Sequence, residues 1–204
     1  MKKNVYLVTG TTRGIGKELK NIFISNDVEF ITFNRSDADF SDPCEVLSFL
    51  PKLKDKILSD YEDYSVILIN NAASLGPVTK MGLQNIEEEI KTISINFSTP
   101  VILFNFLAEL PNKWSVVNIT SGAAYSVNRN LGVYSTTKLA VEKYMKFISL
   151  EDNNCLFCLN YNPGIVKTDM NKKLKNKGFF QDSEEGQTAK EAAQEIWSYL
   201  ESTQ

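Results

Sequence analysis

Short apolar runs alternate with longer stretches of mixed polarity along the chain. The short runs are rich in β-branched residues and occupy residues 5–9, 29–33, 66–70, 115–120 and 155–161. Such continuously apolar segments predict strands of a parallel sheet that is covered on both faces. The longer stretches predict helices at residues 15–25, 43–59, 85–110, 134–150 and 188–202.

This alternation predicts an α/β fold with a Rossmann-type, doubly wound parallel sheet. Strand–helix–strand units of this kind make right-handed crossovers. Ligands of such sheets bind beyond the carboxyl ends of the strands, so the loops after the strands are the informative ones. We expect a single domain over residues 1–204, because no repeat and no Pro-, Gly- or Ser-rich linker divides the chain.

Composition narrows the chemistry. The 204 residues include 22 basic and 25 acidic side chains, for a net charge of −3, and no basic block. We therefore expect neither nucleic acid nor a membrane as a partner. The chain has no histidine, which excludes Ser-His-Asp and Cys-His catalysis and imidazole metal ligands. No metal site is expected, and any catalysis must use Tyr, Lys, Ser, Asp, Glu or a bound cofactor.

The few cysteines, the lack of a membrane-length apolar run and the short first apolar run predict a cytoplasmic protein. Three cysteines (Cys44, Cys155 and Cys158) are too few for a disulfide framework and fit a reducing compartment. Cys155 and Cys158 have the spacing of a redox motif, but positions three apart on a strand face opposite sides, which favours a structural role. No uninterrupted apolar run approaches the ~18 residues of a membrane span, and the first run is too short for a signal peptide.

A glycine-rich loop follows the first predicted strand directly and opens a helix. Its glycines, at positions 10, 14 and 16, permit a tight turn, a close approach of backbone to a pyrophosphate and close helix–strand packing. The helix N-terminus offers free N–H groups to the phosphates. A glycine-rich turn without a ligand is the alternative. The residues predicted to bind a dinucleotide here are Gly10, Thr12, Arg13, Gly14, Ile15 and Gly16.

Two arginines favour NADP(H) as the cofactor. Only three of the 22 basic residues are arginines. Arg13 lies in the glycine loop, and Arg35 follows the second strand between Asn34 and Ser36. At that strand end an acidic residue binds the ribose hydroxyl of NAD, whereas arginine accommodates the 2′-phosphate of NADP. Solvated surface charges are the alternative reading of both arginines.

Tyr134 and Lys138 are candidates for acid–base work without histidine. Four residues apart on a helix, they share a face. A Lys138 cation would lower the pKa of Tyr134 toward working pH, so that the phenol could exchange a proton with a carbonyl or alcohol oxygen. Ser121 follows the strand 115–120 at the same edge of the sheet, where its hydroxyl could polarise that oxygen.

The ordered set of motifs resembles the short-chain dehydrogenase/reductase family over about residues 4–170. The glycine spacing G-x3-G-x-G at residues 10–16 has the family's pattern. The later motifs, in the family's order, are Asn70-Asn71-Ala72-Ala73, Asn96, Ser121, Tyr134 with Lys138, and Asn162-Pro163-Gly164. Ala73 stands where the family more often has glycine.

This resemblance implies a role for each matching residue. Tyr134 is the implied proton donor, Ser121 the substrate positioner and Lys138 the group that lowers the tyrosine pKa and holds the nicotinamide ribose. Asn96 is implied to support a water-linked proton relay from Lys138. Further implied cofactor contacts are Asp39, Phe40, Asn71, Ala72, Ala73, Pro163, Gly164, Val166 and Thr168.

Narrower similarity favours the sepiapterin reductase and benzil reductase branch. Residues 69–76 and 159–164, with Thr168-Asp169-Met170, carry it. The resemblance implies an NADPH-dependent carbonyl reductase that acts on a ketone or vicinal dicarbonyl. A non-catalytic dinucleotide-binding or sensing protein and a reductase of acyl-carrier or sugar substrates stay open as alternatives. Asp169 and Met170 are equally explained by helix capping and core packing.

The chain is shorter than is usual in the family, and two places account for this. Only three residues separate Arg35 from Asp39, whereas a crossover helix between parallel strands needs about a dozen. We therefore expect no helix between the second and third strands, and a rudimentary third strand near residues 38–40. No apolar run follows residues 188–202 to form a last strand. We expect five to six strands with 155–161 at or near an edge, and no counterpart of the segment that anchors pterin.

Two further segments have a predicted role. Residues 164–187 are rich in Lys and Gly and lack apolar periodicity, which is typical of a substrate lid or of a disordered surface loop. The helices 85–110 and 134–150 resemble the family's paired dimer helices, so a homodimer is possible through them. They serve equally well as core helices.

Overall fold

Each of the five apolar runs forms a strand, and together they make one parallel sheet in the computed structural model, which describes residues 3–176 and 186–202. The strand order is β2-β1-β3-β4-β5. The strands are β1 (Asn4–Thr9), β2 (Phe30–Phe33), β3 (Ser65–Asn70), β4 (Trp114–Ile119) and β5 (Cys155–Tyr161). The predicted α/β fold with a parallel sheet is confirmed, and β5 lies at an edge of the sheet as expected.

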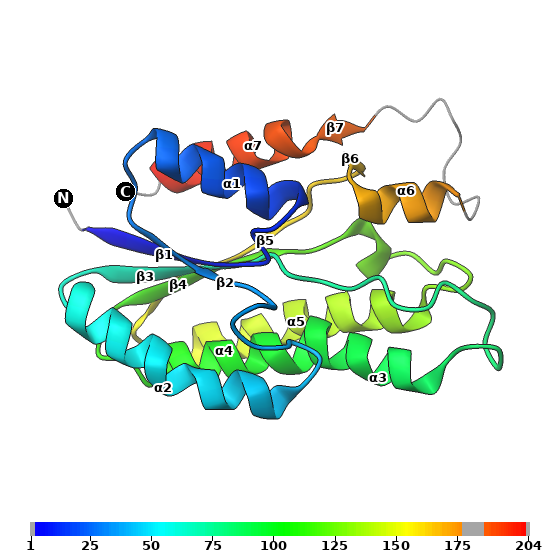
Figure 1. Ribbon diagram of the computed structural model, residues 1–204, viewed down its shortest axis with the longest axis horizontal. Helices are drawn as coiled ribbons and strands as arrows, with labels where there is room; N and C mark the ends of the chain where they lie inside the picture. Colours follow the sequence, from blue (N-terminus) through cyan, green and yellow to red (C-terminus); the bar gives the residue numbers. More distant parts are fainter. Residues whose placement is uncertain (1–2, 177–185, 203–204) are drawn as a thin grey trace.

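Helices cover both faces of the sheet (Figure 1). On one face lie α1 (Gly14–Ser25) and α7 (Ala189–Ser202), and on the other α2 (Pro43–Asp60), α4 (Thr99–Ala108) and α5 (Gly132–Glu151). Successive residues of a strand point to opposite faces. Val5 and Leu7 accordingly pack in the core beside α2, α4 and α5, whereas Tyr6 and Val8 pack in the core beside α1 and α7. This double burial explains why the strands are apolar at almost every position.

The predicted helix at 85–110 is interrupted by a π-helix. It consists of α3 (Ile86–Ile93), the π-helical segment η1 (Ser94–Ser98) and α4. The amide of Thr99 donates to the carbonyl of Ser94, five residues back. Pro100 has no N–H to donate to the carbonyl of Asn96, which removes an α-helical hydrogen bond at this point. By length and composition Ile86–Ala108 could cross a membrane, but half of it is buried inside the fold, as in a core helix.

The predicted rudimentary strand at residues 38–40 is wrong. The chain turns there instead, with the amides of Asp37 and Ala38 donating to the carbonyl of Asn34. Ala38 and Phe40 are buried, and the rings of Phe40 and Phe33 meet with centroids 4.8 Å apart. The segment thus contributes to the core without pairing to the sheet. Because 38–40 is no strand, β3 is the third strand and α2 connects β2 to it, so the predicted absence of a helix between the second and third strands is wrong as well.

The expectation that Cys155 and Cys158 face opposite sides of their strand is also wrong. Trp114 pairs with Cys155 and Val116 with Cys158, so β5 carries one extra residue in a β-bulge. The bulge turns both cysteines toward the core beside α5, with 3.5 Å between their sulfur atoms.

The segment 164–187 contains regular structure that the sequence pattern did not predict. It holds β6 (Val166–Lys167), α6 (Asp169–Lys175) and the start of β7 (Gln187–Thr188). β6 and β7 pair with each other in parallel and form a sheet of their own. The rest of the predicted lid, residues 177–185, lies outside the described residues.

The two-faced core gives a stability prediction. Leu68, in the central strand β3, is fully buried, whereas Leu47 on α2 is exposed. Leu68→Ala should lower the free energy of unfolding by about 2–5 kcal/mol, because it leaves a cavity in a packed core. Leu47→Ala should change it by less than about 0.5 kcal/mol. Urea denaturation checks both variants, and equal losses would contradict the assigned core.

Candidate active site

The strand register brings the predicted site residues to one edge of the sheet. Thr9 pairs with Phe33, Asn70 with Asn118, and Asn118 with Asn160. The loops that follow these strands therefore leave the sheet at the same level.

The glycine loop after β1 is fastened to the end of β3. The side-chain amide of Asn71 donates to the carbonyl oxygens of Thr9 and Gly10, each at 2.9 Å. In return, the Thr9 hydroxyl oxygen accepts from the amides of Asn71 and Ala72, each at 3.0 Å. Asn71 and Ala72 thus hold the conformation of the loop, whatever contact they make with a cofactor.

The N-terminus of α1 fits a phosphate group. Its N-cap residue, Arg13, makes no side-chain capping hydrogen bond, and its first turn holds no acidic residue. Side chains cap the N-termini of α2, α3 and α6, whereas α5, like α1, has no side-chain cap. A Cβ atom on Gly16 would overlap the carbonyl oxygen of Gly10, so only glycine lets the helix approach β1 this closely. Free N–H groups at such a terminus bind anions well.

The second cofactor segment, at Asn34–Phe40, is only partly as predicted. Asn34 Oδ1 accepts from the amide and the hydroxyl of Thr11, at 2.7 and 3.1 Å, so it supports the glycine loop. Arg35 is exposed, as is Ser36, and Arg35 pairs with Asp39 at 3.0 Å. A hydrogen bond from the amide of Ser41 is the main cause of the lowered pKa of Asp39. The ring of Phe40 lies in the core, and the implied cofactor contacts of Asp39 and Phe40 stay predictions.

Tyr134 and Ser121 meet at this edge. Tyr134 is 7% exposed, and Ser121 hydrogen-bonds to its phenol. Burial raises the pKa of Tyr134, and the hydrogen bond from Ser121 offsets part of that rise. Burial, and not the charge of Lys138, dominates the pKa of Tyr134, so the structure does not show the predicted fall of that pKa below its ordinary value.

Lys138 lies one turn further along α5 and is 5% exposed. Its ammonium group donates to the carbonyl oxygen of Ile119, at the end of β4, over 2.8 Å. Burial lowers the pKa of Lys138 to about 8, and the negative charge of Glu142 opposes that fall.

Asn96 connects α5 with the loop after β3. It lies in the π-helical segment, is 3% exposed, and exchanges two hydrogen bonds of 2.8 Å with the backbone of Ser74. Its amide also donates to the hydroxyl of Thr137 at 3.2 Å. These contacts make Asn96 a positioning group for both elements. The water-linked relay to Lys138 stays a prediction.

Apolar side chains surround Tyr134. Leu75, Leu131 and Leu174 form a small buried cluster with it, and Val78, Ala123 and Met170 pack at the margin. The Met170 sulfur lies 4.0 Å from the Tyr134 hydroxyl. Sequence reasoning left Met170 open and missed the three leucines. The i, i+4 spacing of Met170 and Leu174 just after Thr168, a good N-cap residue, was the available signal.

The last predicted cofactor segment, at Pro163–Thr168, supports α6 and β7. Thr168 caps α6 by accepting from the amide of Asn171, and the carbonyl of Pro163 accepts from the side chain of Gln187. The side chain of Val166 is buried in the core. Gly164 has a positive φ of 65°, which favours glycine at this turn.

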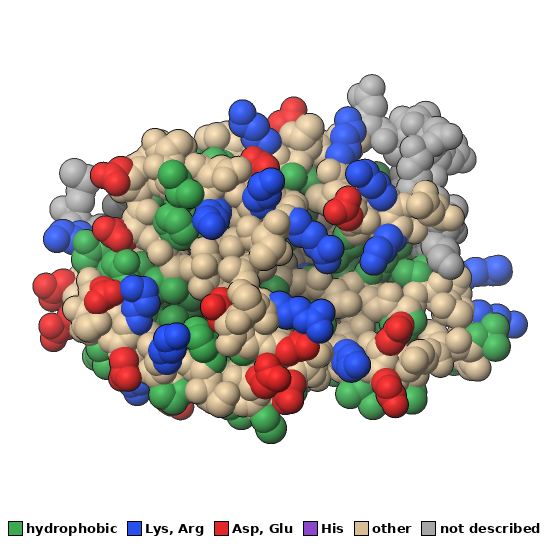
Figure 2. Space-filling view, in the orientation of Figure 1, with side chains coloured by type: hydrophobic (Ala, Val, Ile, Leu, Met, Phe, Trp, Pro, Cys, Tyr) green, Lys and Arg blue, Asp and Glu red, His purple; other side chains and the backbone are tan. Residues whose placement is uncertain are grey.

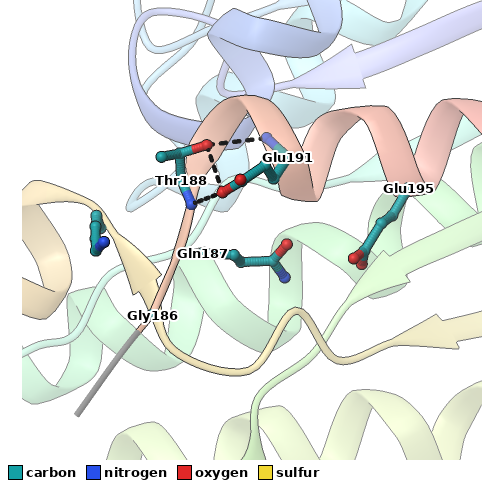
Figure 3. A pocket seen from close by; sticks show the side chains of 6 residues that line it. Gly186, Gln187, Thr188, Glu191 and Glu195 are labelled. Carbon is teal, nitrogen blue, oxygen red and sulfur yellow. Dashed lines mark hydrogen bonds between the residues drawn. The ribbon is translucent and has the colours of Figure 1, made fainter.

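A pocket of about 580 Å³ lies beside α7 and is lined in part by Lys167, from the predicted cofactor segment (Figure 3). Its two carboxylates already have structural partners: Glu191 accepts from Thr188 at the start of α7, and Glu195 accepts from the Tyr161 hydroxyl.

On the face seen in Figure 2, acidic and basic side chains are interspersed, and several basic ones lie over α1 and α6.

The comparisons with known proteins agree with this geometry. Residues 51–178 match the short chain dehydrogenase family, and the chain belongs to that family of oxidoreductases. A benzil reductase of Bacillus cereus that forms (S)-benzoin is 24% identical over 194 residues, covering 83% of this chain and 78% of the relative. A sepiapterin reductase of Xenopus tropicalis is 30% identical over 112 residues, covering 53% of this chain and 42% of the relative.

Solved structures share the fold. Aldohexose dehydrogenase of Thermoplasma acidophilum superposes with a TM-score of 0.76 at 21% identity, covering 96% of this chain and 86% of that one. A short-chain dehydrogenase of Shigella flexneri in complex with NADP has a TM-score of 0.73 at 21% identity, covering 93% and 87% of the two chains.

The buried lysine gives a prediction for stability against pH. Lys138 has a pKa of about 8 in the folded protein and an ordinary value of 10.5. Between these values the unfolded chain binds more protons, so this residue's contribution to the free energy of unfolding rises with pH. Relative to Lys138→Met, the wild type should gain on the order of a few kcal/mol between about pH 7 and about pH 10. Urea denaturation at both values measures it; a constant difference would contradict the buried cation.

Proposed function

We propose that this oxidoreductase is an NADPH-dependent carbonyl reductase that transfers a hydride to a ketone or vicinal dicarbonyl. The observation that carries the proposal is the buried Tyr134 phenol, which Ser121 hydrogen-bonds and apolar side chains enclose. A proton donor beside an apolar wall suits a carbonyl oxygen on an apolar substrate.

The dinucleotide would lie across the carboxyl edge of the sheet. Its pyrophosphate would bind the uncapped N-terminus of α1, and Arg13 and Arg35 would hold the 2′-phosphate. Arg35 is 83% exposed and would exchange its ion pair with Asp39 for that phosphate. NADPH supplies the hydride when it is bound.

The chain's own side chains would manage the proton. Burial raises the pKa of Tyr134, so its phenol is protonated near neutral pH and can donate to the carbonyl oxygen. The Ser121 hydroxyl would hold that oxygen beside the phenol. Lys138, anchored on Ile119, would supply the positive charge that stabilises the phenolate left behind.

The proposed substrate class is an apolar vicinal dicarbonyl. Support comes from Leu75, Leu131, Leu174 and Met170 around Tyr134 and from the benzil reductases among the relatives. Such apolar side chains pack well against aryl or alkyl groups and offer few hydrogen-bond partners to a polyhydroxylated sugar.

We further propose a cytoplasmic homodimer through the helical residues 85–110 and 134–150. Exposed apolar side chains on this surface support it, including Ile86 and Ile90 on α3 and Phe147 and Leu150 on α5. An exposed apolar surface of this kind is typical of an interface.

The proton donor provides the main test. Tyr134→Phe should lower kcat for benzil reduction by at least about 100-fold, because it removes the acidic proton and leaves the ring in place. NADPH oxidation measures the rate, and Tyr199→Phe on α7 is the matched control. An unchanged rate in Tyr134→Phe would contradict the mechanism. Tight NADPH binding by the wild type without turnover of any carbonyl would favour the dinucleotide-binding alternative.

Coenzyme preference provides a second test. Arg13→Ala and Arg35→Ala should each lower kcat/KM for NADPH by about tenfold or more, because each loses a charge-assisted contact with the 2′-phosphate. The value for NADH should change little. The third arginine, the exposed Arg129, provides the control as Arg129→Ala. A wild-type preference for NADH would overturn the assignment of NADP(H).

A further inference from the structure

A buried carboxylate lies behind the candidate active site, and the proposed mechanism does not use it. Glu142 is on α5, one helical turn after Lys138, and is 4% exposed. Among the described residues, these two are the only Lys, Arg, Asp or Glu side chains that are buried. A buried charge is costly unless it has partners, so its position needs an explanation.

Two hydroxyl groups satisfy the carboxylate. Thr120 donates to one oxygen of Glu142 and Tyr125 donates to the other. Thr120 directly precedes Ser121, and Tyr125 directly follows the short 3₁₀ turn η2 (Gly122–Ala124). Glu142 therefore attaches both ends of the Ser121 segment to the helix that carries Tyr134 and Lys138.

The negative charge of the same carboxylate also acts on Lys138. Glu142, one turn further along α5, is the charged group that acts on Lys138, and the end of β4 supplies the carbonyl of Ile119 that accepts from it. The charge of Glu142 raises the pKa of Lys138 against the effect of burial.

We propose that Glu142 is a positioning residue that holds the Ser121 segment on α5 and keeps Lys138 protonated. This inference rests on the proposed function for its kinetic part, because Lys138 and Ser121 are assigned there. Its structural part, the attachment of residues 120–125 to α5, is independent of turnover.

Glu142→Gln tests the proposal by removing the charge at nearly constant shape. Lys138 should then lose its proton at lower pH, so the alkaline limb of kcat/KM should move down by about one pH unit. Near pH 8 the activity relative to the plateau should fall about fivefold. Glu142→Asp should restore most of the limb, because it keeps the charge. Glu151→Gln, the same change at an exposed site on α5, should leave the limb in place.

Hydrogen exchange supplies a readout without turnover. The amides of Ala123, Ala124 and Tyr125 are hydrogen-bonded within the Ser121 segment, and they should exchange at least about tenfold faster in Glu142→Gln. Tyr125→Phe, which removes one donor at an exposed side chain, should speed exchange in the same segment and covers the case in which Glu142→Gln does not fold. Unchanged exchange in the variants, or an unmoved alkaline limb in Glu142→Gln, would overturn the inference. A wild type without carbonyl reduction but with faster exchange in both variants would refute the proposed function and leave the attachment of the segment supported.

Discussion

The site depends on one constraint: neighbouring parallel strands must end at the same level of the sheet. A ladder of side-chain amides marks that level: Asn70 donates to Asn118 and Asn118 to Asn160, each at 2.8 Å. A slip of one residue would turn every side chain of a strand to the other face, breaking this ladder and both cores. Because the register is fixed, Gly10, Asn71 and Thr120 leave the sheet close to one another.

The loops at this edge are coupled through the side chain of Asn71. It holds Thr9 and Gly10 in place from the end of β3, and the backbone of Ser74, three residues later, binds Asn96. Asn96 in turn reaches Thr137 on α5. Hydrogen bonds of 2.8–3.2 Å, joined by the backbone of residues 71–74, thus connect the glycine loop with the helix that carries Tyr134 and Lys138. The π-helical turn presents Asn96 to both sides.

The sequence predicted the parts of this arrangement that local pattern controls. Runs of apolar residues marked all five strands, of which β1, β3 and β4 are buried at almost every position. The spacing of Tyr134 and Lys138 placed them on one helix face. The bulge at Cys155 and Cys158, the burial of Phe40 and the partners of Glu142 could not be predicted, because each depends on contacts between distant segments. The π-helix was missed as well: residues 85–110 were predicted as one helix, although Pro100 in that stretch has no N–H for an α-helical hydrogen bond.

Because the chain has no histidine, the proposed proton transfer depends on Tyr134 and Lys138. The order in which these two groups lose their protons is therefore important. Ordinary values place Tyr at 10.0 and Lys at 10.5, so a free tyrosine would lose its proton first. In this fold burial raises the pKa of Tyr134 and lowers that of Lys138 to about 8, which reverses the order. The phenol therefore keeps its proton over the whole range in which the lysine is charged. The pH at which that charge is lost depends on the negative charge behind the lysine, because burial alone would remove its proton at a still lower pH.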